Sequence, residues 1–193
     1  NRPIAWRDAD LADIEAVDVG WGFTDALGRR PFSGRGFRVP TLDEALSTFP
    51  TMRFNVDLKQ ATPSMVAPIM ALVRRHRAEE RVTLASFRLR TLLEVRQRGY
   101  GGDTALSQPE VAALLVLPRR AFRQLPFIGT AAQLPVAFGR VRLDTPAVIG
   151  KCHDLGMRVD YWTINEPDEA RRLLALGADG IMTDHPAAVL PAM

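Results

Sequence analysis

The stretch RFNVDLKQ, residues 53–60, alternates apolar with polar side chains, which predicts a β-strand. Its apolar residues are Phe54, Val56 and Leu58, and its polar residues are Asn55, Asp57 and Lys59. Successive side chains of a strand point to opposite faces, so the amide, the carboxylate and the ammonium group share one face. In an open sheet that face points to solvent, whereas in a closed parallel barrel it lines the mouth of the active site. A carboxylate at that mouth indicates that a metal ion binds there, and an ammonium group indicates that an anion binds.

Downstream of this strand, the chain repeats a unit of one strand followed by one helix. The pattern predicts strands at residues 81–86, 103–107, 131–135, 157–163 and 180–182, and helices at 63–77, 88–98, 108–117, 145–155, 167–176 and 187–193. Such alternation is typical of parallel βαβ units. An open doubly wound sheet also fits, but no strand ends in a glycine-rich phosphate turn of the dinucleotide type. Polar residues at the strand ends favour a barrel, of which about six of the eight strands are present.

Upstream of the stretch, residues 18–40 are rich in glycine and aromatic residues and show no regular period. An irregular segment of that length inside a compact domain is usually functional. Thr41 then begins a helix, with Glu44 three residues later as its capping-box partner.

The composition is that of an ordinary globular protein: 193 residues, 47% hydrophobic and 24% charged. The net charge of +3 comes from 25 basic and 22 acidic residues, and the arginines form no long run, which argues against a nucleic-acid partner. No apolar run approaches the ~20 residues of a membrane-spanning helix, and no targeting segment is recognisable. The single cysteine, Cys152, excludes an internal disulfide and is expected to be structural. The compartment is open, with the cytoplasm slightly favoured, and the oligomeric state is not predicted.

The last third of the chain carries the most specific pattern: GMRVDYWTIN at residues 156–165 and LLALGADGIMTDHP at 173–186. These stretches resemble the closing strands of the glycerophosphodiester phosphodiesterase family, whose pattern has a Trp-Thr-(Val/Ile)-Asn strand end and a later Gly-(Val/Ala)-Asp-Gly-Ile-(Ile/Met)-Thr-Asp-x-Pro loop. VPTLDEAL at residues 39–46 and NVDLK at 55–59 resemble earlier parts of the family pattern. The resemblance therefore covers nearly the whole chain.

The resemblance implies a TIM-type (β/α)8 barrel of the phosphodiesterase kind, lacking about its first two βα units. Residues 1–193 are then expected to be a single partial barrel domain, with residues 18–40 a glycine-rich loop or insertion. Family members are hydrolases that use a divalent cation, Ca²⁺ or Mg²⁺, to cleave glycerophosphodiesters into sn-glycerol 3-phosphate and an alcohol. The expected partner is thus a small-molecule phosphodiester.

Four residues are expected to form part of the site. The resemblance implies that Asp57 is a metal ligand, although the family usually has the longer Glu there. Lys59 is expected to face the phosphate, Trp162 to contact the substrate at a strand end, and Arg88 to be a further phosphate contact. The alternatives are a structural Asp57–Lys59 pair and core packing of Trp162.

The family's opening His-Arg-Gly strand, its Glu-x-Asp strand and the following His-Asp motif do not occur in this sequence. No catalytic residue is therefore identified. We expect His76 at the surface, His153 in packing or capping, and His185 in the loop after the last strand, where substrate contact is the less favoured role. The expectation is that an N-terminal segment of about sixty residues is missing, and that the chain is inactive by itself.

Two other functions stay open. One is a non-catalytic barrel that binds glycerophosphoryl ligands or a protein partner. The other is a lysophospholipase D-like enzyme on the same fold.

Phe23, Phe32 and Phe37 of the glycine-rich loop have two possible roles. They either line the alcohol side of the site or form a small separate core.

Overall fold

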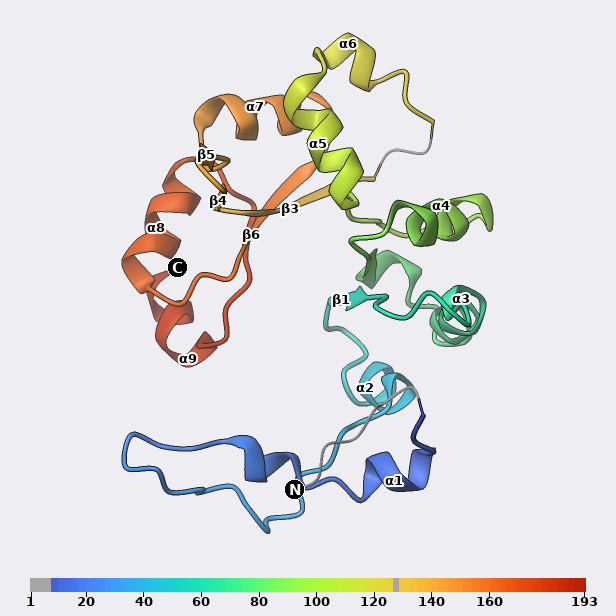
Figure 1. Cartoon of the computed structure of the whole chain (residues 1–193), viewed down its shortest axis with the longest axis vertical. Helices are drawn as coiled ribbons and strands as arrows, with labels where there is room; N and C mark the ends of the chain where they lie inside the picture. The colour runs from blue at the N-terminus through green and yellow to red at the C-terminus, as the bar shows by residue number, and fades with distance from the viewer. Residues whose placement is uncertain (1–7, 127–128) are drawn as a thin grey trace. The chain divides into compact units, whose positions relative to one another are not determined.

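The computed structural model describes residues 8–126 and 129–193 (Figure 1). It divides into two compact units, residues 1–50 and residues 51–193, which are described separately below. Across the described ranges, no helix is both long and apolar enough to cross a membrane. That residues 1–193 form one domain stays a prediction.

The first unit contains three short helices: α1 (Leu11–Glu15), the 3₁₀-helix η1 (Val19–Gly22) and α2 (Leu42–Thr48). Helix α2 begins with the predicted capping box, in which the Thr41 hydroxyl accepts the Glu44 backbone N–H and the Glu44 carboxylate accepts the Thr41 N–H. The Arg38 guanidinium, together with the backbone N–H and hydroxyl of Thr41, lowers the pKa of Glu44 to about 2. The start of α2 is thus fixed by local hydrogen bonds, as its sequence predicts.

The glycine-rich segment 18–40 is organised around the Asp18 carboxylate. This carboxylate accepts the backbone N–H groups of Gly34 at 2.8 Å and Gly20 at 3.0 Å, and the hydroxyl of Ser33 at 3.2 Å. The bond from Gly34 is the largest of the effects that lower the pKa of Asp18. One carboxylate therefore closes a loop that has little regular secondary structure of its own.

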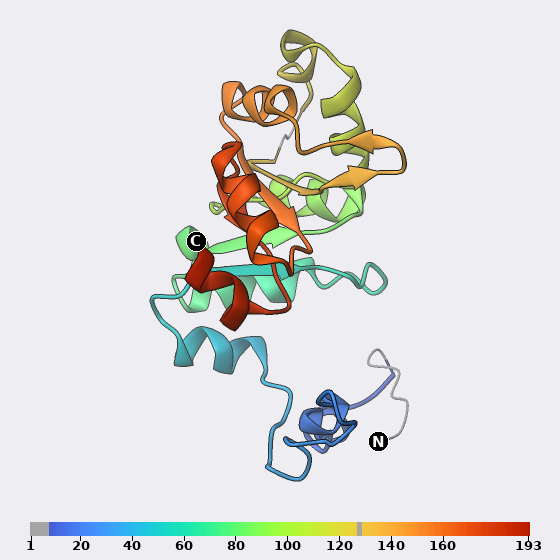
Figure 2. The ribbon, with the colours of Figure 1, turned by 90° about the vertical axis from the view of Figure 1, so that its left-hand side faces the viewer.

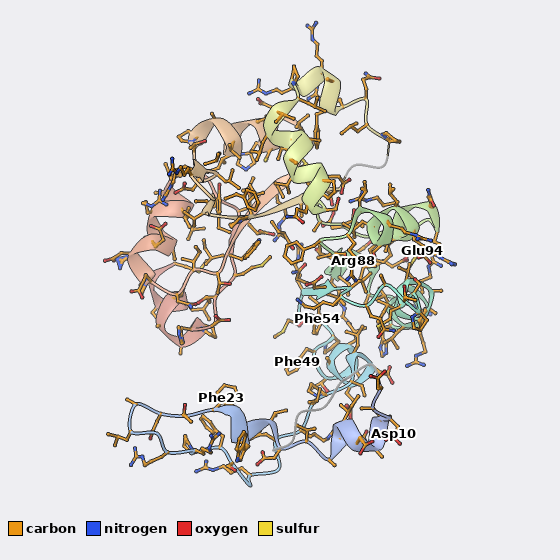
Figure 3. All side chains as sticks on the ribbon, in the orientation of Figure 1. Asp10, Phe23, Phe49, Phe54, Arg88 and Glu94 are labelled. Atoms are coloured by element: carbon orange, nitrogen blue, oxygen red, sulfur yellow. The ribbon has the colours of Figure 1, made fainter. Side chains whose placement is uncertain are left out.

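Two ring contacts join three phenylalanines of the same segment, of which Phe23 is labelled in Figure 3. The Phe32 ring lies edge-on to Phe23, with centroids 5.9 Å apart, and edge-on to Phe37 at 6.0 Å. This geometry is favourable for aromatic pairs. The three rings make a small aromatic cluster within the first unit.

The second unit is built on parallel strands. Its strands are β1 (Phe54–Asp57), β2 (Val82–Ala85), β3 (Ala131–Pro135), β4 (Ala137–Phe138), β5 (Val141–Arg142), β6 (Arg158–Trp162) and β7 (Gly180–Ile181). Strand β1 pairs parallel with β2, and β3 pairs parallel with β6, which pairs parallel with β7. Between the two groups, Thr104 bridges to Leu84 and Ala105 bridges to Ala131, both in parallel. The order across the sheet is therefore β1, β2, residues 104–105, β3, β6 and β7.

The helices follow the strands in the predicted alternation. They are α3 (Val66–Arg75), α4 (Leu89–Gln97), α5 (Gln108–Val116), α6 (Arg119–Phe122), α7 (Pro146–Asp154), α8 (Pro167–Ala175) and α9 (Pro186–Val189), with 3₁₀-helices η2 (Glu79–Arg81) and η3 (Leu190–Ala192). Each predicted helix matches an observed one within about three residues at most ends. The predicted helix 187–193 is instead split into α9 and η3.

Two details differ from the sequence prediction. The predicted strand 103–107 is reduced to the two isolated bridges at Thr104 and Ala105. The antiparallel hairpin β4–β5, visible beside the parallel strands in Figure 2, was not predicted. Its turn contains Gly139 at φ +59°, a conformation that glycine adopts at little cost. Gly139 is therefore a local turn signal for the hairpin.

The core of the second unit lies between β3, β6 and the helices around them. It includes the fully buried Leu134, Val159, Tyr161 and Leu173. The Tyr161 hydroxyl donates to the Leu143 carbonyl at 2.9 Å, which satisfies its one polar group. Cys152 of α7 belongs to this core, and burial raises the pKa of its thiol to about 11. The structural role expected for Cys152 agrees with this position.

A buried ion pair joins α4, α5 and the short central segment of the sheet. Arg96 Nη1 lies 2.6 Å from Glu110 Oε1, and both side chains are 8% exposed. The same guanidinium donates to the Thr104 hydroxyl at 2.9 Å and to the Ala105 carbonyl at 2.8 Å. Glu110 in turn accepts the backbone N–H of Ser107 and so caps α5. One cluster thus fixes the helix start and the weakest part of the sheet.

Replacing Glu110 by Ala is expected to lower the free energy of unfolding by about 3–5 kcal/mol, because the Arg96 charge would stay buried without its partner. Denaturant unfolding followed by circular dichroism measures the change. The matched control is Glu94→Ala, which removes an exposed pair with Arg98 on α4 and should cost far less. Equal effects of the two substitutions would contradict the role given to the buried pair.

The Cys152 thiol is expected to resist thiol reagents in the folded protein at pH 8, because its pKa lies near 11 and its side chain is inaccessible. Reaction with a chromogenic disulfide should give no modification of the native protein and one equivalent after unfolding in denaturant. Rapid modification of the native protein would show that the thiol is not held in the core.

Candidate functional site

The polar face of β1 lines a pocket at the carboxyl end of the parallel strands. The pocket has a volume of about 310 Å³. Its lining residues come from five strands, the loops after them and the central segment at residues 105–106: Asn55, Asp57, Lys59, Ala85, Ser86, Phe87, Ala105, Leu106, Gln133, Trp162 and Met182. Alternation along β1 places Asn55, Asp57 and Lys59 on this side of the sheet, as the sequence predicts. The carboxyl ends of parallel strands are where barrel enzymes carry their active sites.

Asp57 and Lys59 form an ion pair in this pocket. Lys59 Nζ lies 2.9 Å from Asp57 Oδ2, and the side chains are 80% and 31% exposed, in that order. Solvent screens a pair of this exposure, so it contributes little to stability. The ammonium group is at the end of a flexible stem and is accessible to an anion that enters the pocket.

An amide pair crosses the interior below the charged pair. Gln133 Nε2 donates to Asn55 Oδ1 at 3.0 Å, and Asn55 Nδ2 donates to Gln133 Oε1 at 3.4 Å. These residues belong to β1 and β3, which are not neighbours in the sheet. The contact therefore links β1 to β3 on the face of the sheet that also carries Asp57.

A buried ion pair lies at the amino-terminal end of β6. Arg158 Nη2 donates to both oxygens of Asp160, at 2.7 and 2.9 Å, and the Asp160 carboxylate is buried. Gly180 of β7 lies against this carboxylate, because a Cβ at that position would be 2.3 Å from Asp160 Oδ1. Glycine at position 180 therefore lets β7 approach β6 beside a buried charge.

Trp162 forms part of the wall of the pocket at the end of β6. Its ring lies edge-on to Phe87, with centroids 5.9 Å apart. Phe87 follows β2 and is 57% exposed, so the aromatic pair stands at the rim. The two rings offer a flat apolar surface within the same pocket as the charged pair.

Arg88 lies at the edge of the site (Figure 3). Its Nη1 donates to the Lys59 carbonyl at 2.5 Å. A smaller adjoining cavity of about 220 Å³ is lined by Asp57, Leu58, Lys59, Ser86, Phe87 and Arg88. The structure thus brings Asp57 and Lys59 together with Trp162 in the main pocket and with Arg88 in the adjoining cavity. Their functional roles stay predictions.

The described histidines lie apart from this pocket. His153 Nε2 lies 2.9 Å from Asp179 Oδ2, and the same oxygen accepts the Val159 backbone N–H at 2.8 Å. Burial raises the pKa of Asp179, but these two hydrogen bonds outweigh it and hold the pKa below its usual value. His185 is exposed and donates its backbone N–H to the Thr183 hydroxyl. His76 is half-buried at the end of α3.

Phe87 and Gln133 are among the pocket residues that were not predicted as site residues. Phe87 directly follows a strand, and Gln133 is the one polar residue in the strand 131–135. A polar residue inside an otherwise apolar strand is the signal that identifies Gln133. That position becomes informative once the strand is known to face the interior.

A divalent cation needs several oxygen ligands at once. Asp57 is the one carboxylate among the residues that line the pocket, and one of its oxygens contacts Lys59. Over residues 8–126 and 129–193, no group of three or more His, Cys, Asp or Glu side chains is placed to hold a metal ion. The described residues do not, therefore, make a complete cation site.

Comparisons with known proteins agree with this fold. The glycerophosphoryl diester phosphodiesterase family profile matches residues 5–188. A probable glycerophosphodiester phosphodiesterase 2 of Mycobacterium tuberculosis is 35% identical over 162 residues, which is 81% of this chain and 60% of that protein. The chain thus spans less than two thirds of that relative.

Solved structures show the same architecture. The glycerophosphoryl diester phosphodiesterase domain of an uncharacterized M. tuberculosis protein superposes with a TM-score of 0.74 at 19% identity, covering 94% of this chain and 73% of that one. A phosphodiesterase of Oleispira antarctica, solved in complex with the product sn-glycerol-3-phosphate, gives a TM-score of 0.71 at 16% identity, covering 96% and 71%. These likenesses confirm the predicted fold class, and the family match over most of the chain shows that it belongs to the glycerophosphoryl diester phosphodiesterase family.

Proposed function

We propose that the whole protein hydrolyses glycerophosphodiesters to sn-glycerol 3-phosphate and an alcohol, with the phosphate bound in the pocket of Asp57 and Lys59. The observation that carries the proposal is the accessible charged pair at the carboxyl end of parallel strands, in a chain of this family. The relative from M. tuberculosis and the product complex of the O. antarctica phosphodiesterase support it.

Lys59 supplies the positive charge for the phosphate. Phosphodiester hydrolysis concentrates negative charge on the phosphoryl oxygens in the transition state, and an ammonium group beside the phosphate stabilises that charge. Arg88, whose guanidinium lies against the Lys59 carbonyl, adds a second positive charge at the rim. Trp162 forms the wall along which the non-phosphate part of the substrate lies.

A divalent cation, Ca²⁺ or Mg²⁺, is part of the proposal, with Asp57 as one of several ligands. A bound cation would supply charge stabilisation at the phosphoryl oxygens. Because one carboxylate does not hold such an ion, this part rests on family membership and on the position of Asp57. The shorter side chain of Asp, compared with the Glu expected in the family, would change the reach to the ion by one methylene.

Chelation is expected to abolish the activity. The protein should release glycerol 3-phosphate from glycerophosphocholine in a coupled assay, lose that activity in EDTA, and regain it on addition of excess Ca²⁺ or Mg²⁺. Asp57→Asn should raise the cation concentration needed for half-maximal activity, because it removes one ligand charge. Full activity in EDTA would remove the cation from the proposal.

Lys59→Met is expected to lower kcat/KM for glycerophosphocholine by about 100-fold, since one charged stabiliser of the transition state is lost. Lys59→Arg should restore part of it, because the charge is kept. Arg90→Met, on the exposed side of α4 and outside the lining of the described pocket, is the control and should leave kcat/KM within twofold. A Lys59→Met enzyme with normal kinetics would place the phosphate elsewhere.

One observation favours a second candidate, a non-catalytic barrel that binds glycerophosphoryl ligands. Among the described residues, no histidine lines the pocket and no metal-binding cluster is present. Calorimetric binding of sn-glycerol 3-phosphate, together with no hydrolysis of glycerophosphocholine at any cation concentration tested, would favour this candidate over the enzyme.

A further inference from the structure

The glycine-rich segment 18–40 of the first unit presents large apolar side chains to solvent, and the proposed function makes no use of it. Between η1 and α2 this segment contains no helix or strand, as the irregular ribbon in Figure 1 shows. Five of its side chains are between 39% and 76% exposed: Trp21, Phe23, Leu27, Phe32 and Phe37. A group of exposed apolar residues of this size usually marks an interaction surface.

Leu27 is the most exposed of the five, and it lies at the tip of a turn that Asp25 closes. The Asp25 backbone N–H donates to the Arg29 carbonyl at 2.9 Å, and the Arg29 backbone N–H donates to the Asp25 carboxylate at 2.9 Å. The same carboxylate accepts the Leu27 N–H at 2.9 Å. These bonds hold the turn in one shape while the leucine side chain stays in solvent.

The segment also carries an excess of positive charge. It contains two acidic residues, Asp18 and Asp25, and four basic ones: Arg29, Arg30, Arg35 and Arg38. Both carboxylates accept backbone N–H groups of the segment itself, so its acids are used within the loop. The Asp25 side chain is 26% exposed, whereas its partner Arg29 is 72% exposed. The charge that the segment offers to a partner is therefore positive.

Two of the arginines, Arg30 and Arg35, form no ion pair within residues 8–126 and 129–193, whereas the other two each pair with a carboxylate. The Arg30 guanidinium lies over the Trp21 ring, 3.8 Å from its centroid, and donates to the Trp21 carbonyl. A cation on a partly exposed indole ring presents charge and apolar surface at the same place.

Exposed rings and a leucine beside arginines match the surface of a bilayer that contains anionic lipids. Aromatic and leucine side chains enter the boundary between headgroups and acyl chains, while arginine binds the anionic headgroups. A second copy of the chain fits less well, because two copies of this surface would bring like charges together. A nucleic acid also fits less well, because Leu27 gives a base no ring to stack on.

We propose that segment 18–40 docks the protein on an anionic bilayer surface. Leu27 and Phe23, which are 76% and 61% exposed, enter the boundary between headgroups and acyl chains, and Arg30 and Arg35 contact the lipid phosphates. The proposal goes beyond the proposed function and does not depend on it, because the docking surface lies entirely in the first unit.

Flotation of the whole protein with lipid vesicles tests the docking. Vesicles of phosphatidylcholine alone would be compared with vesicles that also contain roughly 30% phosphatidylglycerol, which supplies the anionic headgroups. The protein should bind the anionic vesicles about tenfold more tightly or better, and high salt should weaken this binding. No binding, or equal binding to the two kinds of vesicle, would overturn the proposal.

Leu27→Ser examines the apolar part of the surface. It should weaken binding to the anionic vesicles about tenfold, because the leucine side chain would no longer leave water. The matched control is Leu190→Ser, the same substitution at a position of η3 that is 65% exposed and outside the segment, and it should leave the binding unchanged. Equal effects of the two substitutions would count against insertion of Leu27.

Arg35→Gln examines the electrostatic part. It should weaken binding to the anionic vesicles about fivefold, because one cation near the headgroups is lost. Arg120→Gln removes the same charge from an exposed position of α6 and should change the binding by less than twofold. Circular dichroism should show the same fold for all four variants, since each position is exposed. If Arg120→Gln weakened binding as much as Arg35→Gln, overall charge and not this segment would be responsible, and the proposal would fail.

Other occupants of the surface give different results. A dimer in sedimentation that Leu27→Ser dissociates would show that a second copy covers the segment. Tighter binding to a single-stranded oligonucleotide than to the anionic vesicles would assign the surface to nucleic acid. Either result would overturn the proposal. Vesicle binding without hydrolysis of glycerophosphocholine would support the docking and count against the enzyme, so the two proposals fail separately.

Discussion

The hydrogen bonds of the Arg96 guanidinium are the constraint on which the sheet of the second unit depends. Between β2 and β3 the sheet narrows to single bridges at Thr104 and Ala105. Arg96 donates to the side chain of the first residue and to the carbonyl of the second, and its charge is balanced by buried Glu110. A segment too short to hold two strands together by backbone pairing is thus secured by a charged side chain from α4.

The same cluster lies next to the candidate site. Glu110 caps α5 and pairs with Arg96, and the central segment that Arg96 holds contributes Ala105 to the pocket. The joined sheet also brings β1 and β3 close enough for the Asn55–Gln133 amide pair. Asp57 and Lys59 follow Asn55 on the same face of β1, so the ion pair of the pocket lies next to the Asn55–Gln133 hydrogen bonds.

Local patterns predict much of this arrangement, since period-two alternation at residues 53–60 and capping signals such as Thr41–Glu44 are contained in a few adjacent residues. The reduction of strand 103–107 to two bridges depends on its neighbours and on Arg96, which no local pattern shows. From local pattern alone, Gln133 is a single polar residue in an apolar strand. Its role depends on the hydrogen bond with Asn55, which lies 78 positions away in the sequence. The wall of the pocket also depends on tertiary contacts, because Phe87, Leu106, Gln133 and Trp162 come from four separate segments of the chain.

The pocket combines charged groups with aromatic rings. Asp57 and Lys59 form its exposed ion pair, and Arg88 lines the adjoining cavity. In the proposed function a divalent cation at Asp57 would add to the positive charge available to the phosphate. The proposed preference for a phosphodiester over a phosphate monoester therefore follows from the Phe87–Trp162 ring pair, which gives a second substituent on the phosphate an apolar wall to lie against.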